Sequence, residues 1–114
     1  MISNRIEHND PDGSLGFIES IYFSDNVLKS TYFPKTHMMY ISFSRGGTYS
    51  YSNVDMELYI KFENVDSQGE FFHKNIAKFP SKYKARKEFT LYPEELNEIK
   101  NQRQNTINED GRGI

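Results

Sequence analysis

A strand–turn–strand pattern in the middle of the chain constrains its fold more than any other feature of the sequence. Residues 38–44 and 48–53 flank the turn sequence Arg45-Gly46-Gly47. Apolar side chains alternate along both flanks, at Met39, Ile41, Phe43, Tyr49 and Tyr51. Alternation of this kind around a glycine turn predicts an antiparallel hairpin with one buried face.

Two further extended segments precede this hairpin. Residues 17–23 end at Ser24-Asp25-Asn26, and residues 27–33 end at Pro34-Lys35-Thr36. Both breaks are rich in turn-forming residues, whereas the segments themselves are rich in aromatic and β-branched residues. The pattern predicts a small antiparallel β-sheet of three to five strands over residues 17–53.

The period of the pattern changes after this sheet. Apolar residues then recur at spacings of four and three, which predicts a helix over about residues 55–66. The residues with this spacing are Leu58, Phe62 and Val65. Asn53 or Asp55 is expected to cap the start of this helix, and Gly69 is expected to stop it.

Two more helices are expected further along the chain. Residues 71–79 predict a short second helix that ends at Pro80 and has three apolar side chains on one side: Phe72, Ile76 and Phe79. Residues 81–88 are basic and are expected to be irregular. A third helix is expected to start at Pro93, because proline is favoured at the first helical position. The predicted architecture is α+β, with a small antiparallel sheet followed by two short helices packed on one face and a peripheral C-terminal helix.

The aromatic residues divide the chain into a predicted domain and two appendages. All eight Tyr and nine Phe lie between Phe17 and Tyr92. We therefore expect a flexible N-terminal arm over residues 1–16 and one folded domain over residues 17–92. A C-terminal helix and frayed tail are expected over residues 93–114. A chain of 114 residues has room for one hydrophobic core.

Composition excludes several classes of protein. The chain has no Cys, which rules out a disulfide framework, a cysteine zinc site and thiol chemistry. No stretch approaches the roughly 20 apolar residues that a membrane-spanning helix needs. The polar first residues are unlike a signal peptide. We therefore expect a cytoplasmic protein, in a bacterium or in an infected host cell.

The order of these elements and several short motifs resemble the KTSC domain family. The resemblance runs from residue 26 to about residue 80. The residues that carry the family motif are Tyr49, Tyr51, Ser67, Gly69 and Phe72, within the sequences Tyr49-Ser50-Tyr51 and Ser67-Gln68-Gly69-Glu70-Phe71-Phe72. The chain departs from the family pattern at two positions. The family tends to have a proline where this chain has Asp55, and a small residue where this chain has Val65.

The resemblance implies a small domain of the kind found at the C-terminus of some lysyl-tRNA synthetases and as free-standing bacterial and phage proteins. This family is thought to bind RNA and has no established activity. The resemblance therefore implies a fold more strongly than a function. Residues outside 26–80 are expected to carry whatever is particular to this chain.

No arrangement of side chains in the sequence predicts catalysis. His8, His37 and His73 lie in the expected arm, beside a turn and on a short helix, and none forms a metal-ligand arrangement with a second His or a carboxylate. No serine lies in a nucleophile-elbow sequence. Glu94-Glu95 is explained by the dipole of the helix that it starts, and Gly46-Gly47 by the hairpin turn. We therefore expect a non-catalytic binding module without a metal or cofactor.

Positive charge is concentrated in one segment. The formal net charge of the chain is −2, yet residues 71–87 contain six cations and no acid. The candidate binding residues are Lys74, Lys78, Lys82, Tyr83, Lys84, Arg86 and Lys87. Cations neutralise phosphates and aromatic faces stack on unpaired bases, so the segment predicts a surface for RNA or single-stranded nucleic acid. Two other interpretations remain open: a solvated basic face with Phe79 in the core, and a contact with an acidic protein.

A second functional hypothesis is a small protein-interaction factor, such as a phage-encoded inhibitor of a host defence or transcription complex. Its basis is the small size of the chain, its mild acidity, the aromatic residues expected to be exposed and the extra segments beyond the resembling core. One face of the sheet, with Tyr22, Tyr32 or Tyr40 exposed, would then serve as a stacking or protein-docking platform. The alternative places these rings in the core. An exposed strand edge or aromatic face would also allow a homodimer.

Overall fold

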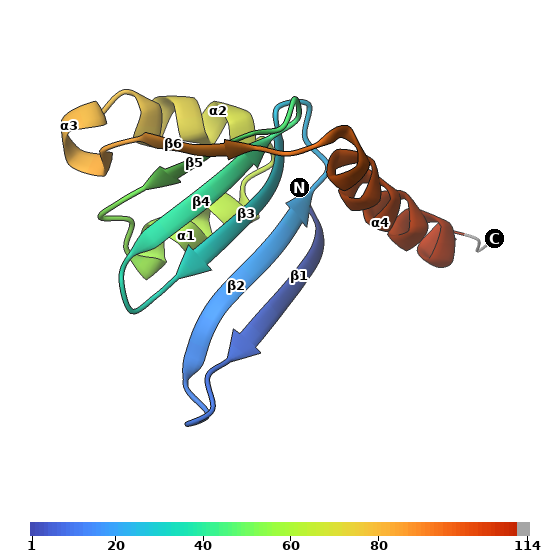
Figure 1. Cartoon of the computed structure of the whole chain (residues 1–114), viewed down its shortest axis with the longest axis horizontal. Coiled ribbons are helices and arrows are strands. Elements are labelled where there is room, and N and C mark those ends of the chain that lie inside the picture. Colours follow the sequence, from blue (N-terminus) through green and yellow to red (C-terminus); the bar gives the residue numbers. More distant parts are fainter. Residues whose placement is uncertain (112–114) are drawn as a thin grey trace.

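The computed structural model describes the backbone of residues 1–111 and the side chains of residues 1–103. Six antiparallel strands follow one another in chain order across one sheet (Figure 1). They are β1 (Ile2–Asn9), β2 (Leu15–Tyr22), β3 (Val27–Phe33), β4 (Met38–Phe43), β5 (Gly47–Tyr51) and β6 (Arg86–Thr90). The fold is α+β, as expected, and its sheet is slightly larger than the three to five strands predicted.

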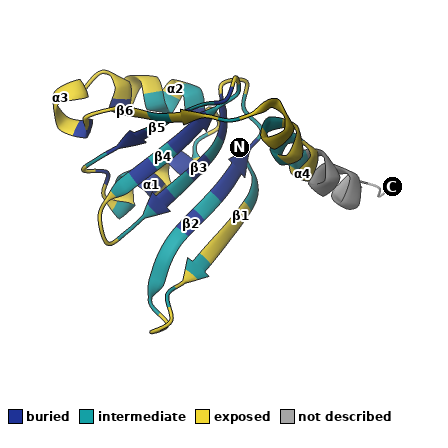
Figure 2. Cartoon of the chain, in the orientation of Figure 1, coloured by how far each residue is buried: buried dark blue, intermediate teal, exposed yellow. Residues whose placement is uncertain are grey.

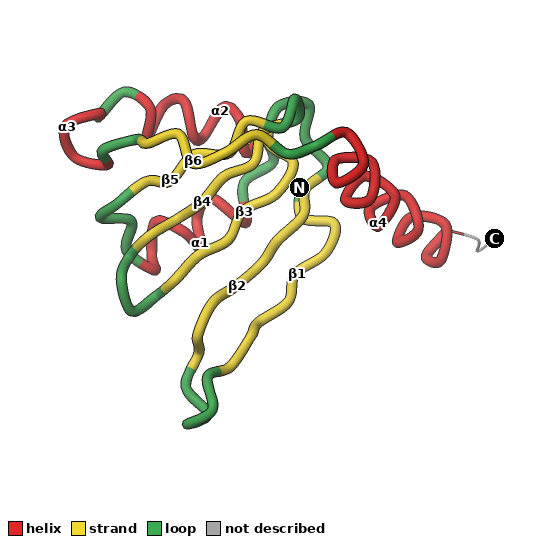
Figure 3. Tube along the Cα trace, in the orientation of Figure 1, coloured by secondary structure: helices red, strands yellow, loops and turns green. Residues whose placement is uncertain are grey.

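The helical layer is inserted between β5 and β6. It consists of α1 (Met56–Asn64), α2 (Gln68–Phe72), the π-helix η1 (His73–Ala77) and α3 (Pro80–Tyr83). Figure 3 shows α1 and α2 on one side of the strands, with α3 at the end of the layer. Asp55 caps α1 by accepting the backbone N–H of Leu58 at 2.8 Å, which confirms one of the two predicted caps.

Aromatic rings fill the space between this layer and the sheet. Tyr32 of β3 and Tyr59 of α1 stack with ring centroids 4.5 Å apart, and both are fully buried. Tyr22 of β2 meets Phe62 of α1 edge to face at 5.5 Å. These rings cover the helix-facing side of the sheet, because inward side chains alternate with outward ones along each strand.

Two of the buried tyrosine hydroxyls share one serine as their hydrogen-bond partner. Ser30 Oγ lies 2.7 Å from the hydroxyl of Tyr22 and 2.8 Å from that of Tyr59. Burial raises the pKa of Tyr59 to about 12 and raises that of Tyr22 further. Both phenols therefore stay protonated at neutral pH and can donate hydrogen bonds inside the core.

The hairpin predicted around Arg45-Gly46-Gly47 is the β4–β5 hairpin. Gly46 has a φ of +103°, and a Cβ there would lie 3.1 Å from the carbonyl oxygen of Leu91. The carbonyl oxygen of Gly46 accepts the N–H of Leu91 at 2.9 Å. Glycine is therefore required both by the turn and by the close passage of the chain that leads into the last helix.

The last helix, α4 (Pro93–Gly111), begins at Pro93 as predicted and lies by one end of the sheet (Figure 1). Arg103 anchors it by donating from Nη1 to the carbonyl oxygen of Tyr22 at 2.8 Å. The frayed tail expected within residues 93–114 is wrong as far as Gly111, because α4 continues to that residue. Residues 112–114, the remainder of the expected tail, lie outside the described residues.

The flexible arm expected over residues 1–16 is wrong, because residues 2–9 form β1 and pair with β2 along its whole length. This strand carries no Phe or Tyr, so the predicted domain limits, which were set by the first and last Phe or Tyr, did not include it. It is held by the β2 ladder and by Arg5, whose Nε donates to both carboxylate oxygens of Glu63 at 3.2 and 3.0 Å. The folded domain therefore begins before Phe17.

Three expectations around the second helix are also corrected. The helix expected over 71–79 is α2 followed by η1, so the helical segment begins at Gln68. Gly69 does not stop α1; it lies inside α2, and α1 ends at Asn64 with an extended Val65. The segment 81–88, expected to be irregular, contains part of α3 and the start of β6. Pairing with β5, a contact distant in sequence, gives β6 its order.

Replacing Arg5 with Met should lower the free energy of unfolding by about 3 kcal/mol, because Glu63 would be left as a buried carboxylate without a cation. The Glu63 side chain is only 1% exposed. Urea unfolding measures this change. Glu7→Gln removes the exposed ion-pair partner of the same arginine and should cost less than about 1 kcal/mol. Equal effects of the two substitutions would show that Glu63 does not depend on Arg5.

Candidate functional site

The basic segment wraps around one corner of the molecule, from η1 through α3 to the edge strand β6 (Figure 1). Two contacts fix it to the loop that follows β5. Ser52 N–H donates to the carbonyl oxygen of Tyr83 at 2.7 Å, and Asn53 Nδ2 donates to that of Lys82 at 2.8 Å. Lys84 then turns the chain into β6 with a positive φ of 46°. The segment is therefore a folded part of the domain.

The predicted cations of this segment are exposed. Figure 2 shows exposed residues along nearly all of α3 and β6. Two of the cations have a carboxylate nearby: Lys74 Nζ lies 2.8 Å from Glu70, and Arg86 Nε lies 3.8 Å from Glu88. Within the described part of the chain, the other four have no carboxylate partner within 4.0 Å: Lys78, Lys82, Lys84 and Lys87. Their charges are available to an anionic ligand.

Tyr83, expected to stack on a base, is only 6% exposed and belongs to the hydrophobic core. Lys82 Nζ lies 5.2 Å from the centroid of its ring. The exposed ring in this segment is Phe79, at 51%. The spacing rule placed Phe79 on the buried side with Ile76, but the π-helical turn of η1 shifts the residues after it relative to an α-helix. No local signal in the sequence marks that turn.

The face of the sheet opposite α1 carries a row of aromatic rings. His8 of β1 stacks on Phe17 of β2 at 4.2 Å, Phe17 lies 5.4 Å from Phe33 of β3, and Phe33 meets Tyr40 of β4 at 5.8 Å. All of these side chains are half-buried. Of the three tyrosines considered for an exposed platform, Tyr22 and Tyr32 are fully buried and only Tyr40 lies on this face. Recognising the other rings required the strand register, which sequence alternation alone does not provide.

Helix α4 covers one end of this open face and leaves two adjoining hollows. The first, of about 240 Å³, has a largely apolar lining that includes Tyr40, Phe89 and Ile99. The second, of about 360 Å³, includes the acidic residues Glu19, Glu95 and Glu98. Although partial burial of Glu19 disfavours its charge, hydrogen bonds from Lys29 and His8 lower the pKa of its carboxyl. Glu19 is therefore ionised at neutral pH, and the second hollow is unfavourable for an anion.

The resembling motif residues have structural roles. Ser67 caps α2 by accepting the N–H of Glu70 at 3.2 Å, and a Cβ on Gly69 would lie 3.2 Å from Cβ of Asn26. Phe72 packs edge to face on Tyr51 at 5.2 Å, and Tyr49 packs on Phe43. The motif therefore specifies how the helices join the sheet.

Gln68, which lies within the same motif, completes that junction. Its side chain is fully buried, and Nε2 donates to the carbonyl oxygens of Phe62 and Val65 at 3.3 and 2.9 Å. Its Oε1 accepts a hydrogen bond from the amino group of Met1. The end of α1 is thus capped from the start of α2.

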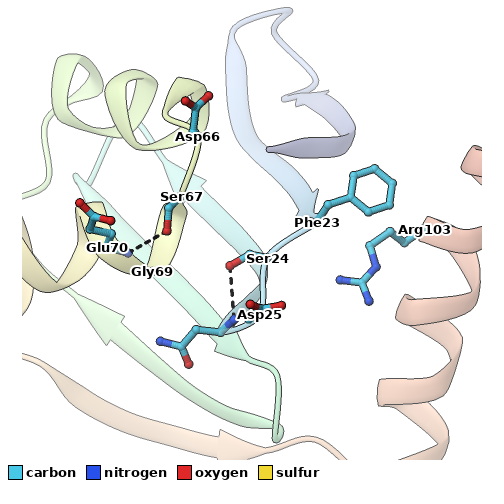
Figure 4. Close-up of a pocket in the computed structure, with 9 residues that line it drawn as sticks. Phe23, Ser24, Asp25, Asp66, Ser67, Gly69, Glu70 and Arg103 are labelled. Atoms are coloured by element: carbon cyan, nitrogen blue, oxygen red, sulfur yellow. Dashed lines mark hydrogen bonds between the residues drawn. The ribbon is translucent and has the colours of Figure 1, made fainter.

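A larger cavity than these two hollows, about 750 Å³, lies between this junction, the β2–β3 turn and α4 (Figure 4). Three acids, Asp25, Asp66 and Glu70, line it together with Arg103. Among the described residues no group of three or more His, Cys, Asp or Glu is placed to hold a metal ion. The predominance of acids makes this cavity unsuited to a phosphate chain.

No helix in the described part of the chain is long and apolar enough to cross a membrane.

These features define a small α+β domain in which an antiparallel meander is backed by short helices, and the Ser-Gln-Gly sequence at the start of α2 fixes the junction between α1 and α2. A family model described as the KTSC domain matches residues 24–79. Over this segment the chain belongs to the KTSC domain family, which confirms the family suggested by the motifs.

A solved relative agrees with this assignment. The chain is similar to the crystal structure of a KTSC domain protein from Yersinia pestis, with 28% sequence identity and a TM-score of 0.57. The similarity covers 65% of this chain and 100% of that protein's chain. A search of curated proteins gives no match. About a third of the chain therefore lies outside the region shared with that structure.

Replacing Gln68 with Leu should lower the free energy of unfolding by about 2 kcal/mol, because the buried carbonyls that end α1 would lose their donor. Chemical denaturation checks the value. Asn64→Leu is the matched control, since Asn64 Nδ2 donates to the carbonyl oxygen of Ile60 at an exposed site where water can replace it. A Gln68→Leu protein as stable as the control would remove the capping role assigned to Gln68.

Proposed function

We propose that the protein is a non-catalytic module that binds RNA or single-stranded nucleic acid through the corner formed by η1, α3 and β6. The observation that carries this proposal is a set of four exposed lysines that have no carboxylate partner among the described residues, in the same segment as the exposed ring of Phe79. Cations hold a phosphate backbone, and an exposed ring offers a face on which an unpaired base can stack. Arg86 adds a donor fork suited to phosphate at the start of β6.

The remaining charge of the chain supports a restricted rather than a diffuse interface. The net charge of −2 opposes a general approach of nucleic acid, so binding has to rely on the basic corner. Tyr83 is buried in the core beneath this corner. The exposed ring of Phe79, rather than Tyr83, is therefore the one proposed to stack on a base.

Reversing two charges tests the proposal. Lys82→Glu combined with Arg86→Glu should weaken binding to a mixed-sequence RNA and reduce the slope of log affinity against log salt by roughly 1.4. Gel-shift titrations over a salt series measure both quantities. Undetectable binding of the wild-type protein at low salt would end the proposal.

The matched control reverses two exposed cations elsewhere, Arg45→Glu with Lys61→Glu, and so changes the net charge by the same amount. Its salt slope should stay close to that of the wild type. If both double variants lose affinity equally, binding follows net charge and has no site at this corner.

A specific feature also favours a protein-interaction role as a second candidate. Tyr92, in the loop before α4, is 70% exposed, and Ile6 on the edge strand β1 is 57% exposed. Aromatic side chains are enriched among the contact residues of protein interfaces, and an exposed strand edge can pair with another chain. A stoichiometric partner that remains bound after nuclease treatment, and is lost on Tyr92→Ser with Ile6→Ser, is the expected result. Retention of the partner by this double variant would exclude these residues as the interface.

A further inference from the structure

The hollow beside Tyr40 has the size of a site for a single flat ring. Its volume of about 240 Å³ lies below the roughly 300–1,000 Å³ of sites for drug-sized ligands. Phe89, 52% exposed, lines it from β6 and has no ring contact with another aromatic within the described residues. Tyr40 lines the hollow from β4, and Ile99 lines it from α4. A planar ligand would therefore meet apolar surface from both the sheet and the helix.

Two hydroxyls in the lining of this hollow give it a polar feature. Ser42 Oγ and Thr48 Oγ1 are buried and lie 2.8 Å apart. Thr48 Oγ1 donates to the carbonyl oxygen of Gly46 at 3.2 Å, so Ser42 is the donor in the bond that the two hydroxyls share. Lone pairs of Ser42 Oγ therefore remain as acceptors, and the N–H groups of a nucleobase are suitable donors for them.

The strand register joins this hollow to the basic corner. Tyr40 lies directly opposite Ser50, and Ser50 lies directly opposite Arg86. Directly opposed residues share a face of the sheet, so Arg86 is on the open face at two strand spacings, roughly 10 Å, from Tyr40. Its side chain is 80% exposed despite the nearby Glu88. The same short strand, β6, thus carries both Arg86, which can donate hydrogen bonds to a phosphate, and Phe89, whose ring lines the hollow.

We propose that this hollow binds one unpaired base of the single-stranded nucleic acid whose phosphates contact the basic corner; the inference rests on the function proposed above. Charge complementarity selects this occupant over an aromatic side chain of a protein partner. A phosphate attached to a base in the hollow can reach Arg86 on one side. On the other side the acids Glu95 and Glu98 line the neighbouring hollow, so the strand approaches across β6.

The test compares a short fluorescein-labelled oligouridylate with an abasic strand of equal length and equal phosphate number. Fluorescence anisotropy at one salt concentration gives both affinities. The wild-type protein should bind the base-containing strand about tenfold more tightly. Phe89→Ala should bring this ratio close to one and leave the affinity for the abasic strand unchanged. Phe89 is exposed, so the loss of its side chain should leave the melting temperature unchanged.

Two variants and one control keep the result specific to the hollow. Ile99→Phe fills the hollow from α4 without altering a charge and should also abolish the preference for bases. Tyr40→Phe keeps the ring and should retain the preference. Tyr92→Ala removes an exposed aromatic ring that does not line the hollow and should behave as the wild type.

The failure of this inference differs from the failure of the proposed function. If the wild-type protein binds both strands equally, the hollow takes no base, although binding through the cations stands. A preference for bases that survives in both Phe89→Ala and Ile99→Phe also overturns the inference. If neither strand binds at low salt, the proposed function and the inference fall together.

Discussion

The polar contacts buried between the sheet and α1 set the position of almost everything else in the molecule. Ser30 holds the hydroxyls of Tyr22 and Tyr59, and Glu63 accepts from Ser20 Oγ at 2.7 Å and from Arg5. Buried hydroxyls and a buried carboxylate are costly without partners, so α1 has few orientations in which all of them are satisfied. This requirement fixes one face of the sheet under the helices and leaves the opposite face open.

The local elements could be predicted from the sequence, whereas the edges of the sheet could not. The β4–β5 hairpin and α1 follow from alternation, a glycine turn and helical spacing, all of which are contained in short windows. β1 and β6 have little apolar alternation, and their order comes from pairing with β2 and β5. Because this order comes from pairing with a distant segment, the sequences of β1 and β6 contain no clear signal for a strand.

The sequence predicted the exposed cations of the candidate site but not its exposed aromatic residue. Exposed Lys and Arg are expected wherever a run of cations lacks acids, and the structure places that run at one corner. The ring assigned to the site, Tyr83, is buried, and the exposed ring is Phe79, because η1 interrupts the helical spacing. The row from His8 to Tyr40 could not be assembled without the register of four strands, even though each ring had been read as part of a strand or arm.

The residues that line the hollow on the open face come partly from the family segment and partly from the segments that follow it. The KTSC segment, residues 24–79, supplies Tyr40, Ser42 and Thr48 on the sheet side of the hollow. Segments after it supply Phe89, Leu91 and Ile99, together with Arg86 on the edge strand. The family motif itself is used in the junction between helices and sheet, where Gln68, Ser67 and Phe72 cap and pack. A ligand bound on the open face would thus contact residues of the family segment and residues that follow it, while the motif residues hold the helices on the opposite face.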